Sequence, residues 1–545
     1  MLEEINVINK MEKKAIKSSR MSLVRLGFAL FFVFAVFLYV YINKGGVSNN
    51  IFLIIASLFG AYMAMNIGAN DVANNIGPAV GSKALTMAGA IAIAAVFEAS
   101  GALIAGGDVV QTIKKGIIDI HSFGFDIKSF IWAMMAALLA AALWLNFATY
   151  FKAPVSTTHS IVGGVMGAGI AAFGFGVVSW GTMGKIAASW VISPVIGGAI
   201  AAFFLYSIKK TILFKEDRVG SAKKWIPVFV AVMSWAFVTY LVLKGLKHVW
   251  VDVVQVLSFL PDTKKPTFVE ANVFGLIGAI ITYIYTKNSI AKSISDDNSR
   301  ENISKYFTIP LVFAAALLSF AHGANDVANA VGPLAAISDA VINNAISAKA
   351  GIPFWVMAVG GFGISIGLAL YGPKLIKTVG SEITELDKIR AFSIAIAAAI
   401  TVIVASQLGL PVSSTHIALG GVFGVGFLRE WLDKVSNLEV EVKEEEIDLE
   451  EEKMLLAGLK DELKELQKKD DKSLEDYERM VELFKLITKE EKKIKKEKKV
   501  IKSIKKTEYV KRDAIKKIVA AWLVTVPVAA LLSAMIFFML KGMFI

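Results

Sequence analysis

One short stretch occurs twice in this chain, near the start and again past the middle. Gly-Ala-Asn-Asp-Val-Ala-Asn at residues 68–74 is repeated at 323–329, and Gly-Pro follows each copy at the same distance. Each copy ends a long apolar run, where an uncompensated Asp costs about 2.5–3.5 kcal/mol in a bilayer. Pro-Val-Ser-Thr-Thr-His at 154–159 and Pro-Val-Ser-Ser-Thr-His at 411–416 form a second repeated pair. The repeat therefore covers a whole half-protein.

Composition places this duplicated chain in a membrane. Hydrophobic residues make up 55% of it and charged residues 19%, and the mean hydropathy is +0.60. These values predict an all-α, polytopic membrane protein. The chain has no cysteine, which excludes a disulfide framework and a thiolate metal site. The net charge of +12 comes from Lys and Arg in loops between apolar runs, so the positive-inside rule accounts for it and nucleic acid is not an expected partner.

The order of apolar runs and basic loops predicts the domain organisation. Residues 1–50 form a basic tail and an extra transmembrane helix, and 51–207 form repeat 1 with apolar spans near 51–67, 84–106, 129–150, 162–178 and 184–207. A basic cytoplasmic loop with two spacer helices fills 208–306. Repeat 2 occupies 307–428 and 513–545, with spans near 308–322, 352–371, 391–407, 416–428 and 517–540. The N-terminus is expected in the cytoplasm and the C-terminus outside.

This count makes the second repeat begin inside, where the first begins outside. The two copies are therefore expected to be inverted-topology repeats, with broken or re-entrant helices at the midplane of the membrane. Residues 429–512 interrupt repeat 2 with a segment rich in Glu and Lys. Two apolar stripes in it predict an antiparallel, coiled-coil helical hairpin in the cytoplasm: Leu456, Leu459, Leu463 and Leu466, then Tyr477, Met480, Phe484 and Ile487. Ser473 and Asp476 have the spacing of a capping box.

The Pro-Val-Ser motifs predict helix N-termini inside the membrane. Proline suits the turn before a helix and serine is a preferred N-cap, so Ser156 and Ser413 are expected to open helices. Free N–H groups at a helix start, flanked by hydroxyls, form an anion site. The alternative is that these hydroxyls only satisfy backbone carbonyls or let helices pack closely. His159 and His416 follow three residues after each Ser, and a structural hydrogen-bonding role is the simpler interpretation of them.

Asp71 and Asp326 bring carboxylates beside the amides of the same motif. Such oxygens suit a hard monovalent cation or a substrate that carries a proton. A bare carboxylate repels an anion, so an anion and these Asp residues are compatible only with a cation between them or with a hydrogen bond from the anion. Dihydrogen phosphate can donate that bond and sulfate cannot. Glu98 and Gln111 are further candidates in the membrane, and the position aligned with Glu98 in repeat 2, near Ile364, is apolar.

At these residues the sequence resembles the inorganic phosphate transporter (PiT) family, relatives of the type III sodium-phosphate cotransporters. The resemblance covers both repeats and implies a secondary transporter that takes up inorganic phosphate by symport with sodium ions, or with protons. It implies phosphate contacts from Ser156, Thr157, Thr158, Ser413, Ser414 and Thr415. It also implies sodium contacts from Asn70, Asp71, Asn74, Asn325, Asp326 and Asn329. Possible accessory residues are Glu98, Gln111, His159 and His416.

Two other functions compete with phosphate symport. A related sulfate permease belongs to the same class. An intramembrane hydrolase is suggested by Ser156, His159 and Asp71, whose residue types match a catalytic triad. Duplication argues against an enzyme, because a hydrolase needs one nucleophile while a site between repeats draws matching groups from both. The chain also lacks a Walker-type phosphate-binding loop. Expected partners are phosphate, sodium or protons, the lipid bilayer and a second copy of the chain; no cofactor besides the coupling ion is expected, and the location is the plasma membrane.

Overall fold

The computed structural model describes residues 2–46, 50–119, 122, 126–151, 153–247, 249–257, 260–261, 263–293, 297–346, 351–382, 386–433, 439–469, 473–505 and 512–544. These residues fall into two compact units, Met1–Val425 with Arg512–Ile545, and Gly426–Lys511. Within the described ranges the regular structure is helical, apart from one bridge between Ile118 and Val178. The chain is therefore an all-α protein, as its composition predicts.

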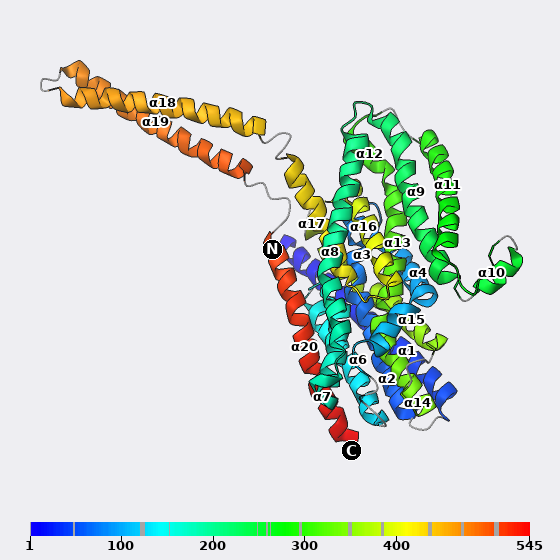
Figure 1. Cartoon of the computed structure of the whole chain (residues 1–545). Helices are drawn as coiled ribbons and strands as arrows, with labels where there is room; N and C mark the ends of the chain where they lie inside the picture. The colour runs from blue at the N-terminus through cyan, green and yellow to red at the C-terminus, as the bar shows by residue number, and fades with distance from the viewer. Residues whose placement is uncertain are drawn as a thin grey trace. The chain divides into compact units, whose positions relative to one another are not determined.

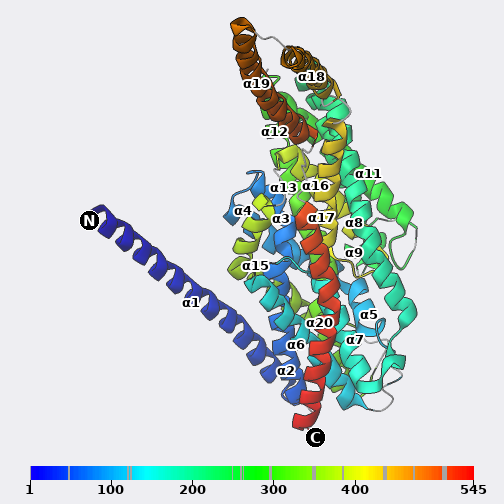
Figure 2. The ribbon, with the colours of Figure 1, turned by 90° about the vertical axis from the view of Figure 1, so that its left-hand side faces the viewer.

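Eleven stretches among the described residues are long and apolar enough to cross a membrane. They lie in α1 (Leu2–Lys44), α2 and α3 (Asn50–Asn70, Val72–Gly81), α4 (Met87–Ala105), α6 (Ile127–Tyr150), α8 (Trp180–Ile208), α9 (Arg218–Gly245), α11 (Phe268–Ser293), α13 and α14 (Thr308–Asp326, Ala328–Asn343), α15 (Phe354–Glu382), α16 (Lys388–Gln407) and α20 (Arg512–Phe544). Short helices join them: α5 (Gly107–Lys115), α10 (Trp250–Val256) and α12 (Arg300–Tyr306). The chain is a multi-pass membrane protein (Figures 1 and 2).

Two of the expected spans lie in helices that are not among the eleven stretches long and apolar enough to cross a membrane. The run at 162–178 belongs to α7 (Thr157–Phe173), which has 17 residues and ends at Gly174, whose φ is +78°. The run at 416–428 belongs to α17 (Ser414–Asp433), which continues past the apolar residues through Arg429 and Glu430. The expected runs and the helices therefore have different bounds: apolar residues continue beyond the end of α7, and charged residues continue the helix in α17.

The closest helix crossings pair one helix from each half of the sequence. On α2 and α15, a Cβ atom added to Gly68 or Gly367 would lie 1.9 Å from a carbonyl oxygen of the other helix. Gly101 of α4 and Gly323 of α13 are similarly close, with 1.9 and 2.1 Å. Glycines of α7 meet α20, and those of α17 meet α8: Gly163, Gly167, Gly420 and Gly424. Small residues let membrane helices approach closely, so the two halves interlock instead of packing as separate bundles.

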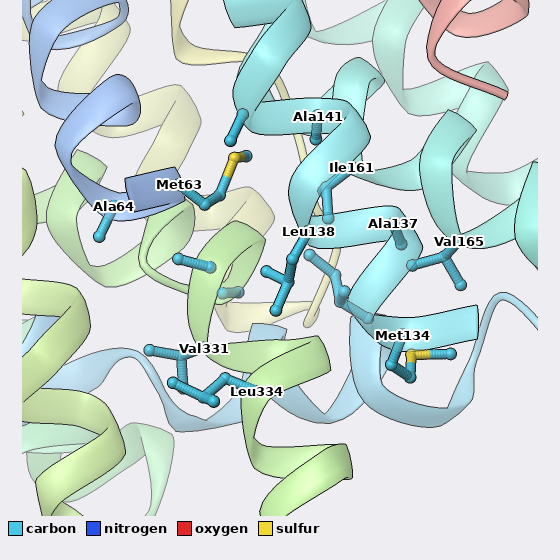
Figure 3. Packing of buried hydrophobic residues seen from close by; sticks show 14 of the residues in the cluster. Met63, Ala64, Met134, Ala137, Leu138, Ala141, Ile161, Val165, Val331 and Leu334 are labelled. Atoms are coloured by element: carbon cyan, nitrogen blue, oxygen red, sulfur yellow. The ribbon is translucent and has the colours of Figure 1, made fainter. Parts of the chain in front are cut away.

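A continuous apolar core lies inside these interlocked helices. Figure 3 shows Met63 of α2, Leu138 of α6 and Ile161 of α7 facing Val331 and Leu334 of α14. All five side chains are buried. The core therefore joins three helices of the first half of the sequence with α14, the helix that follows the second Asp motif.

The second unit contains an antiparallel helical pair. Helices α18 (Glu439–Lys468) and α19 (Leu474–Lys505) run side by side in Figure 1 and are tied by ion pairs, such as Lys460 with Glu491 at 2.6 Å. The capping box is confirmed, since the Ser473 backbone N–H donates to Asp476 and the Asp476 N–H donates to Ser473 Oγ. Residues 470–472, where the turn was expected, lie outside the described residues.

One stripe of this pair differs from the sequence interpretation. Leu456, Leu459, Leu463 and Leu466 of α18 pack on Met480, Leu483 and Ile487 of α19, but Tyr477 and Phe484 do not take part in this contact and are exposed. The face of α19 that contacts α18 is adjacent to the predicted one. It carries Met480, Leu483 and Ile487, which also follow a spacing of three and four residues. The error arose because two apolar stripes lie next to each other on α19, and the sequence does not say which one faces α18.

Candidate functional site

Both Asp motifs lie where a helix is interrupted. Helix α2 ends at Asn70 and α3 begins at Val72, so Asp71 occupies the break. Helix α13 ends at Asp326 and α14 begins at Ala328. Both Asp side chains are fully buried. Each interruption is one residue long, because Asp71 and Val327 keep right-handed helical backbone angles. The two carboxylates thus lie at irregularities in the middle of long membrane stretches.

The Pro-Val-Ser motifs open helices as their sequence predicts. Ser156 is the N-cap of α7, and its Oγ accepts the His159 backbone N–H at 3.1 Å. Ser413 immediately precedes α17, and its Oγ accepts the His416 backbone N–H at 3.3 Å. The residues that follow each cap, Thr157, Thr158, Ser414 and Thr415, are buried. Two helix N-termini with flanking hydroxyls thus lie inside the protein, and such ends attract anions.

Thr157 joins the two Asp motifs. Its Oγ1 lies 2.7 Å from Asp71 Oδ2 and 2.8 Å from Asp326 Oδ2, and Asn329 Nδ2 donates to it at 3.0 Å. A hydroxyl has one proton, so it can donate to only one of these carboxylates. The two carboxylates therefore face each other across one oxygen in a site with no exposed surface. Their mutual repulsion in such a site favours a cation or a proton between them.

The second helix start reaches the same carboxylate from the other half. Ser414 Oγ donates to Asp71 Oδ1 at 3.2 Å, and Thr415 Oγ1 also contacts Oδ1. Asn74 Nδ2 donates to Thr415 Oγ1 at 2.7 Å. The matching contact in the other half has Asn329 Nδ2 donating to Thr158 Oγ1 at 3.2 Å. The amide after each Asp thus binds a hydroxyl of the opposite half.

Several oxygens in this cluster have no hydrogen-bond partner. Among the described residues these are Asn74 Oδ1, Asn329 Oδ1, Asn325 Oδ1 and Asp326 Oδ1, all buried. Buried polar atoms are normally hydrogen-bonded, so a set of unpartnered oxygens needs an explanation. Carbonyl and carboxylate oxygens are the ligands of hard cations, and Asp71, His322 and Asp326 also offer ligand atoms within 4.8 Å of one another. The donor set fits a cation such as sodium.

His322 and Glu98 extend the cluster on one side only. His322 Nδ1 lies 2.6 Å from Glu98 Oε2, and Nε2 lies 3.3 Å from Asp326 Oδ2. Asn75 Nδ2 donates to the other Glu98 oxygen at 3.1 Å. Glu98 and His322 are fully buried. Glu98 is among the residues expected from the sequence and His322 is not, although the sequence carries a signal for it: His322 stands where the first motif has the apolar Ile67.

The remaining expected site residues lie at the edge of this cluster. Asn70 and Asn325 brace the loops before α7 and α17, because Asn70 Nδ2 donates to Ala153 O at 3.1 Å and Asn325 Nδ2 to Leu410 O at 3.2 Å. Gln111 is half-buried on α5, next to Thr112, which donates to Gly409 O at 2.7 Å.

The two histidines of the Pro-Val-Ser motifs form a ring cluster. His159 and His416 meet with ring centroids 4.5 Å apart. His159 contacts Trp190 of α8, and His416 stacks on Trp522 of α20 at 3.5 Å. Each motif thus contributes one ring to a contact between the halves, and these rings pack behind the helix starts.

Comparison with known proteins gives the family of the chain. The sequence profile of the Phosphate transporter family matches residues 67–533, which include both motif pairs. The chain belongs to the phosphate transporter family. A candidate phosphate permease of Helicobacter pylori (strain ATCC 700392 / 26695) is 49% identical over 98% of both chains, and one of Pyrococcus furiosus is 39% identical over 69% of this chain and 87% of its own.

A solved structure extends the likeness to the fold. The sodium-dependent phosphate transporter of that structure has 30% sequence identity and a TM-score of 0.68, covering 90% of this chain and 99% of its own. The family is one of transporters, so the triad-like composition of Ser156, His159 and Asp71 does not make this chain a hydrolase. In the structure Ser156 caps a helix, while Asp71 contacts hydroxyls of both halves.

Proposed function

We propose that this phosphate transporter family member takes up inorganic phosphate by symport with sodium ions. The observation that carries the proposal is the position of Thr157, a residue at a helix N-terminus that lies within 2.8 Å of carboxylates from both halves. An anion at the starts of α7 and α17 would lie beside two carboxylates, and a cation between them removes the repulsion. Binding of anion and cation is then coupled, because each makes the site more favourable for the other.

The proposed phosphate ligands are the hydroxyls and backbone N–H groups at the two helix starts. Thr157, Thr158, Ser414 and Thr415 supply hydroxyls, while Ser156 and Ser413 hold the first turns in place. The proposed sodium ligands are the carboxylates with the unpartnered amide oxygens of Asn74 and Asn329. His322, whose other ring nitrogen contacts Glu98, lies against the same Asp326 oxygen as Thr157 and helps to fix its position.

The transport cycle that we propose is alternating access between two inverted halves. Its support is the pairing of helices, since α2 with α15, α4 with α13, α7 with α20 and α8 with α17 each join one helix from each half at close approach. In transporters built from inverted repeats a pseudo-two-fold relation sets matching groups on opposite sides of one site, and the proposed cycle needs the same relation here. We further propose that the N-terminus and the α18–α19 pair are cytoplasmic and that the C-terminus is outside.

Uptake of radiolabelled phosphate into proteoliposomes tests the coupling. A sodium gradient and a pH gradient are imposed separately, with a potassium gradient as the matched control. We expect an inward sodium gradient to drive accumulation and the potassium gradient to leave uptake at the level of empty vesicles. Accumulation that responds to the pH gradient alone would assign the coupling to protons. Uptake indifferent to both gradients would contradict symport.

Competition by sulfate separates phosphate from a related permease function. Phosphate at neutral pH carries a proton that can reach Asp71 or Asp326, whereas sulfate carries none. We expect excess sulfate to leave labelled phosphate uptake nearly unchanged, while unlabelled phosphate abolishes it. Equal competition by the two anions would contradict the assigned substrate.

A further inference from the structure

Helix α19 carries an apolar stripe that no described residue of its own unit covers. Leu474, Tyr477, Val481 and Phe484 follow one another at steps of three, four and three, so they share one face of the helix. Their side chains are 77%, 55%, 55% and 51% exposed. The face that packs on α18 lies beside this stripe and contains Met480, Leu483 and Ile487. The apolar surface of α19 is therefore wider than one neighbouring helix can cover.

The helical pair has little buried apolar surface of its own. Its buried apolar side chains in the described residues are Leu449, Leu463, Leu483, Ile487 and Ile494. Two paired helices with so few buried residues are marginally stable in water, because a small domain buries a small share of its surface. Covering a second stripe of three large residues and a leucine would add a comparable amount of buried surface. The usual solution for such a pair is a four-helix bundle.

The charges beside the stripe favour a second α19 in the opposite direction. Glu478 lies next to the first half of the stripe, and Lys485 lies next to the second half on the same side. Both side chains are exposed. If two stripes meet in antiparallel orientation about Val481, Glu478 of one copy faces Lys485 of the other. A parallel pair would place like charges at the same level.

These observations select one partner. We propose that α19 pairs antiparallel with α19 of a second copy of this chain, so that two helical pairs form a four-helix bundle around Tyr477, Val481 and Phe484. An anionic bilayer surface is a poorer partner, because the first half of the stripe is flanked by Glu. No residue of the proposed transport site lies in this unit, so the bundle assembles two transporters without forming part of the phosphate site.

Disulfide cross-linking in the full chain tests this pairing. The chain has no cysteine, so Val481→Cys introduces a single thiol close to the proposed two-fold axis. We expect mild oxidation in membranes to give a covalent dimer of twice the chain mass. Met454→Cys is the matched control, since Met454 is 68% exposed on α18 away from the stripe. Absence of the Val481→Cys dimer, or an equal yield from Met454→Cys, would overturn the proposal.

A charge swap on the Val481→Cys background tests the orientation. Glu478→Lys places Lys against Lys across the antiparallel pair, so the cross-linked fraction should fall several-fold. Adding Lys485→Glu to the same chain restores opposite charges and should restore the yield. Both substitutions are at exposed positions, so we expect phosphate uptake to stay at the parent level. Uptake at that level also serves as the control that the variants are folded. A double variant that cross-links no better than Glu478→Lys alone would contradict the antiparallel register.

Discussion

At the scale of single residues, Asp71 and Asp326 define what this site can hold. Each is fully buried, each lies at a helix break, and both contact the same Thr157 hydroxyl. Hydrogen bonds from Ser414, Thr415 and Thr157 reach Asp71, whereas Asp326 has His322 and Thr157 and keeps one oxygen unpartnered. The two carboxylates are thus unequal in their partners. A coupling cation would complete the coordination of Asp326 more than that of Asp71.

Asp71→Asn and Asp326→Asn should each abolish sodium-dependent phosphate uptake. Each change removes a negative charge from the shared site and an acceptor for a protonated phosphate. Removing one partner of a buried charge pair costs about 3–5 kcal/mol, which corresponds to roughly 150- to 4,000-fold weaker sodium binding. The measurement is initial uptake of labelled phosphate as a function of sodium concentration in proteoliposomes.

Asp217→Asn is the matched control for these variants. Asp217 caps α9, where its side chain accepts the Gly220 N–H at 2.7 Å, and Asn is an equally good N-cap. We expect this variant to transport like the parent chain. Parental sodium dependence in both Asp71→Asn and Asp326→Asn would show that the shared carboxylate site is wrong.

Glu98 and His322 mark the limit of what the residues alone could predict. The repeated motifs indicate Asp71, Asp326 and the hydroxyls, because duplication marks them twice. Glu98 has no counterpart in repeat 2, and His322 has none in repeat 1. Repetition of the motifs therefore marks neither residue as part of the site. Their 2.6 Å contact shows that one residue of each half is the partner of the other. Contacts between residues 224 positions apart depend on how the helices cross, which the sequence pattern does not contain.

At the scale of helices, glycine contacts set the distance between the halves. A Cβ atom on Gly101 would lie 1.9 Å from Phe320 O, and one on Gly323 would lie 2.1 Å from Glu98 O. These two contacts hold α4 against α13, the helices that carry Glu98 and His322. The crossing of α4 and α13 therefore decides whether the Glu98–His322 contact forms. The repeated motifs alone do not reveal this dependence.

Gly101→Ala should separate α4 from α13 and lower both stability and uptake. A methyl group at 1.9 Å from a backbone oxygen forces a backbone shift, and overpacking of this kind costs about 1–3 kcal/mol. Thermal unfolding of the purified protein in detergent measures the stability, and proteoliposome uptake measures the transport. We expect a lower midpoint temperature together with slower uptake.

Gly184→Ala in α8 is the control for that substitution. No heavy atom lies within 4 Å of a Cβ built at Gly184, so the methyl group meets no neighbour. Alanine is also a better helix former by about 0.5–1 kcal/mol. This variant should unfold at or above the parent temperature and transport normally. An unfolding midpoint for Gly101→Ala equal to that of Gly184→Ala would show that α4 and α13 can separate at no cost.

The sequence predicts the presence of the helices well, but it predicts their ends and their packing faces less well. Apolar length placed the eleven membrane stretches, because hydrocarbon imposes helix on any long apolar run. It gives different bounds for α7 and α17, which begin at the Pro-Val-Ser motifs and whose ends are set by Gly174 in one case and by a charged continuation in the other. The stripe of α19 that faces α18 was also misjudged, since both stripes satisfy the same spacing.

At the scale of the whole molecule, the arrangement of the chain across the bilayer is a proposal that three glycines can test. Gly46 follows α1, Gly458 lies in α18, and Gly542 lies near the end of α20. A Cβ atom at any of the three meets no atom within 4 Å, so a cysteine fits each place without strain. The absence of native cysteine makes each introduced thiol the only one to label.

Labelling of these cysteines with a membrane-impermeant maleimide in intact cells gives the orientation. We expect Gly46→Cys and Gly542→Cys to react from outside and Gly458→Cys to react only after the membrane is permeabilised, because the basic loops favour the cytoplasm. Gly458 precedes α20, and Gly542 lies at the far end of its one membrane stretch, Val519–Met543. These two positions must therefore differ in accessibility whichever way the protein is inserted. If all three react from outside, α20 does not cross the membrane and the α18–α19 pair is not cytoplasmic. If only Gly458→Cys reacts from outside, the helices cross as described but the protein is inserted in the opposite direction, and the basic loops no longer explain its orientation.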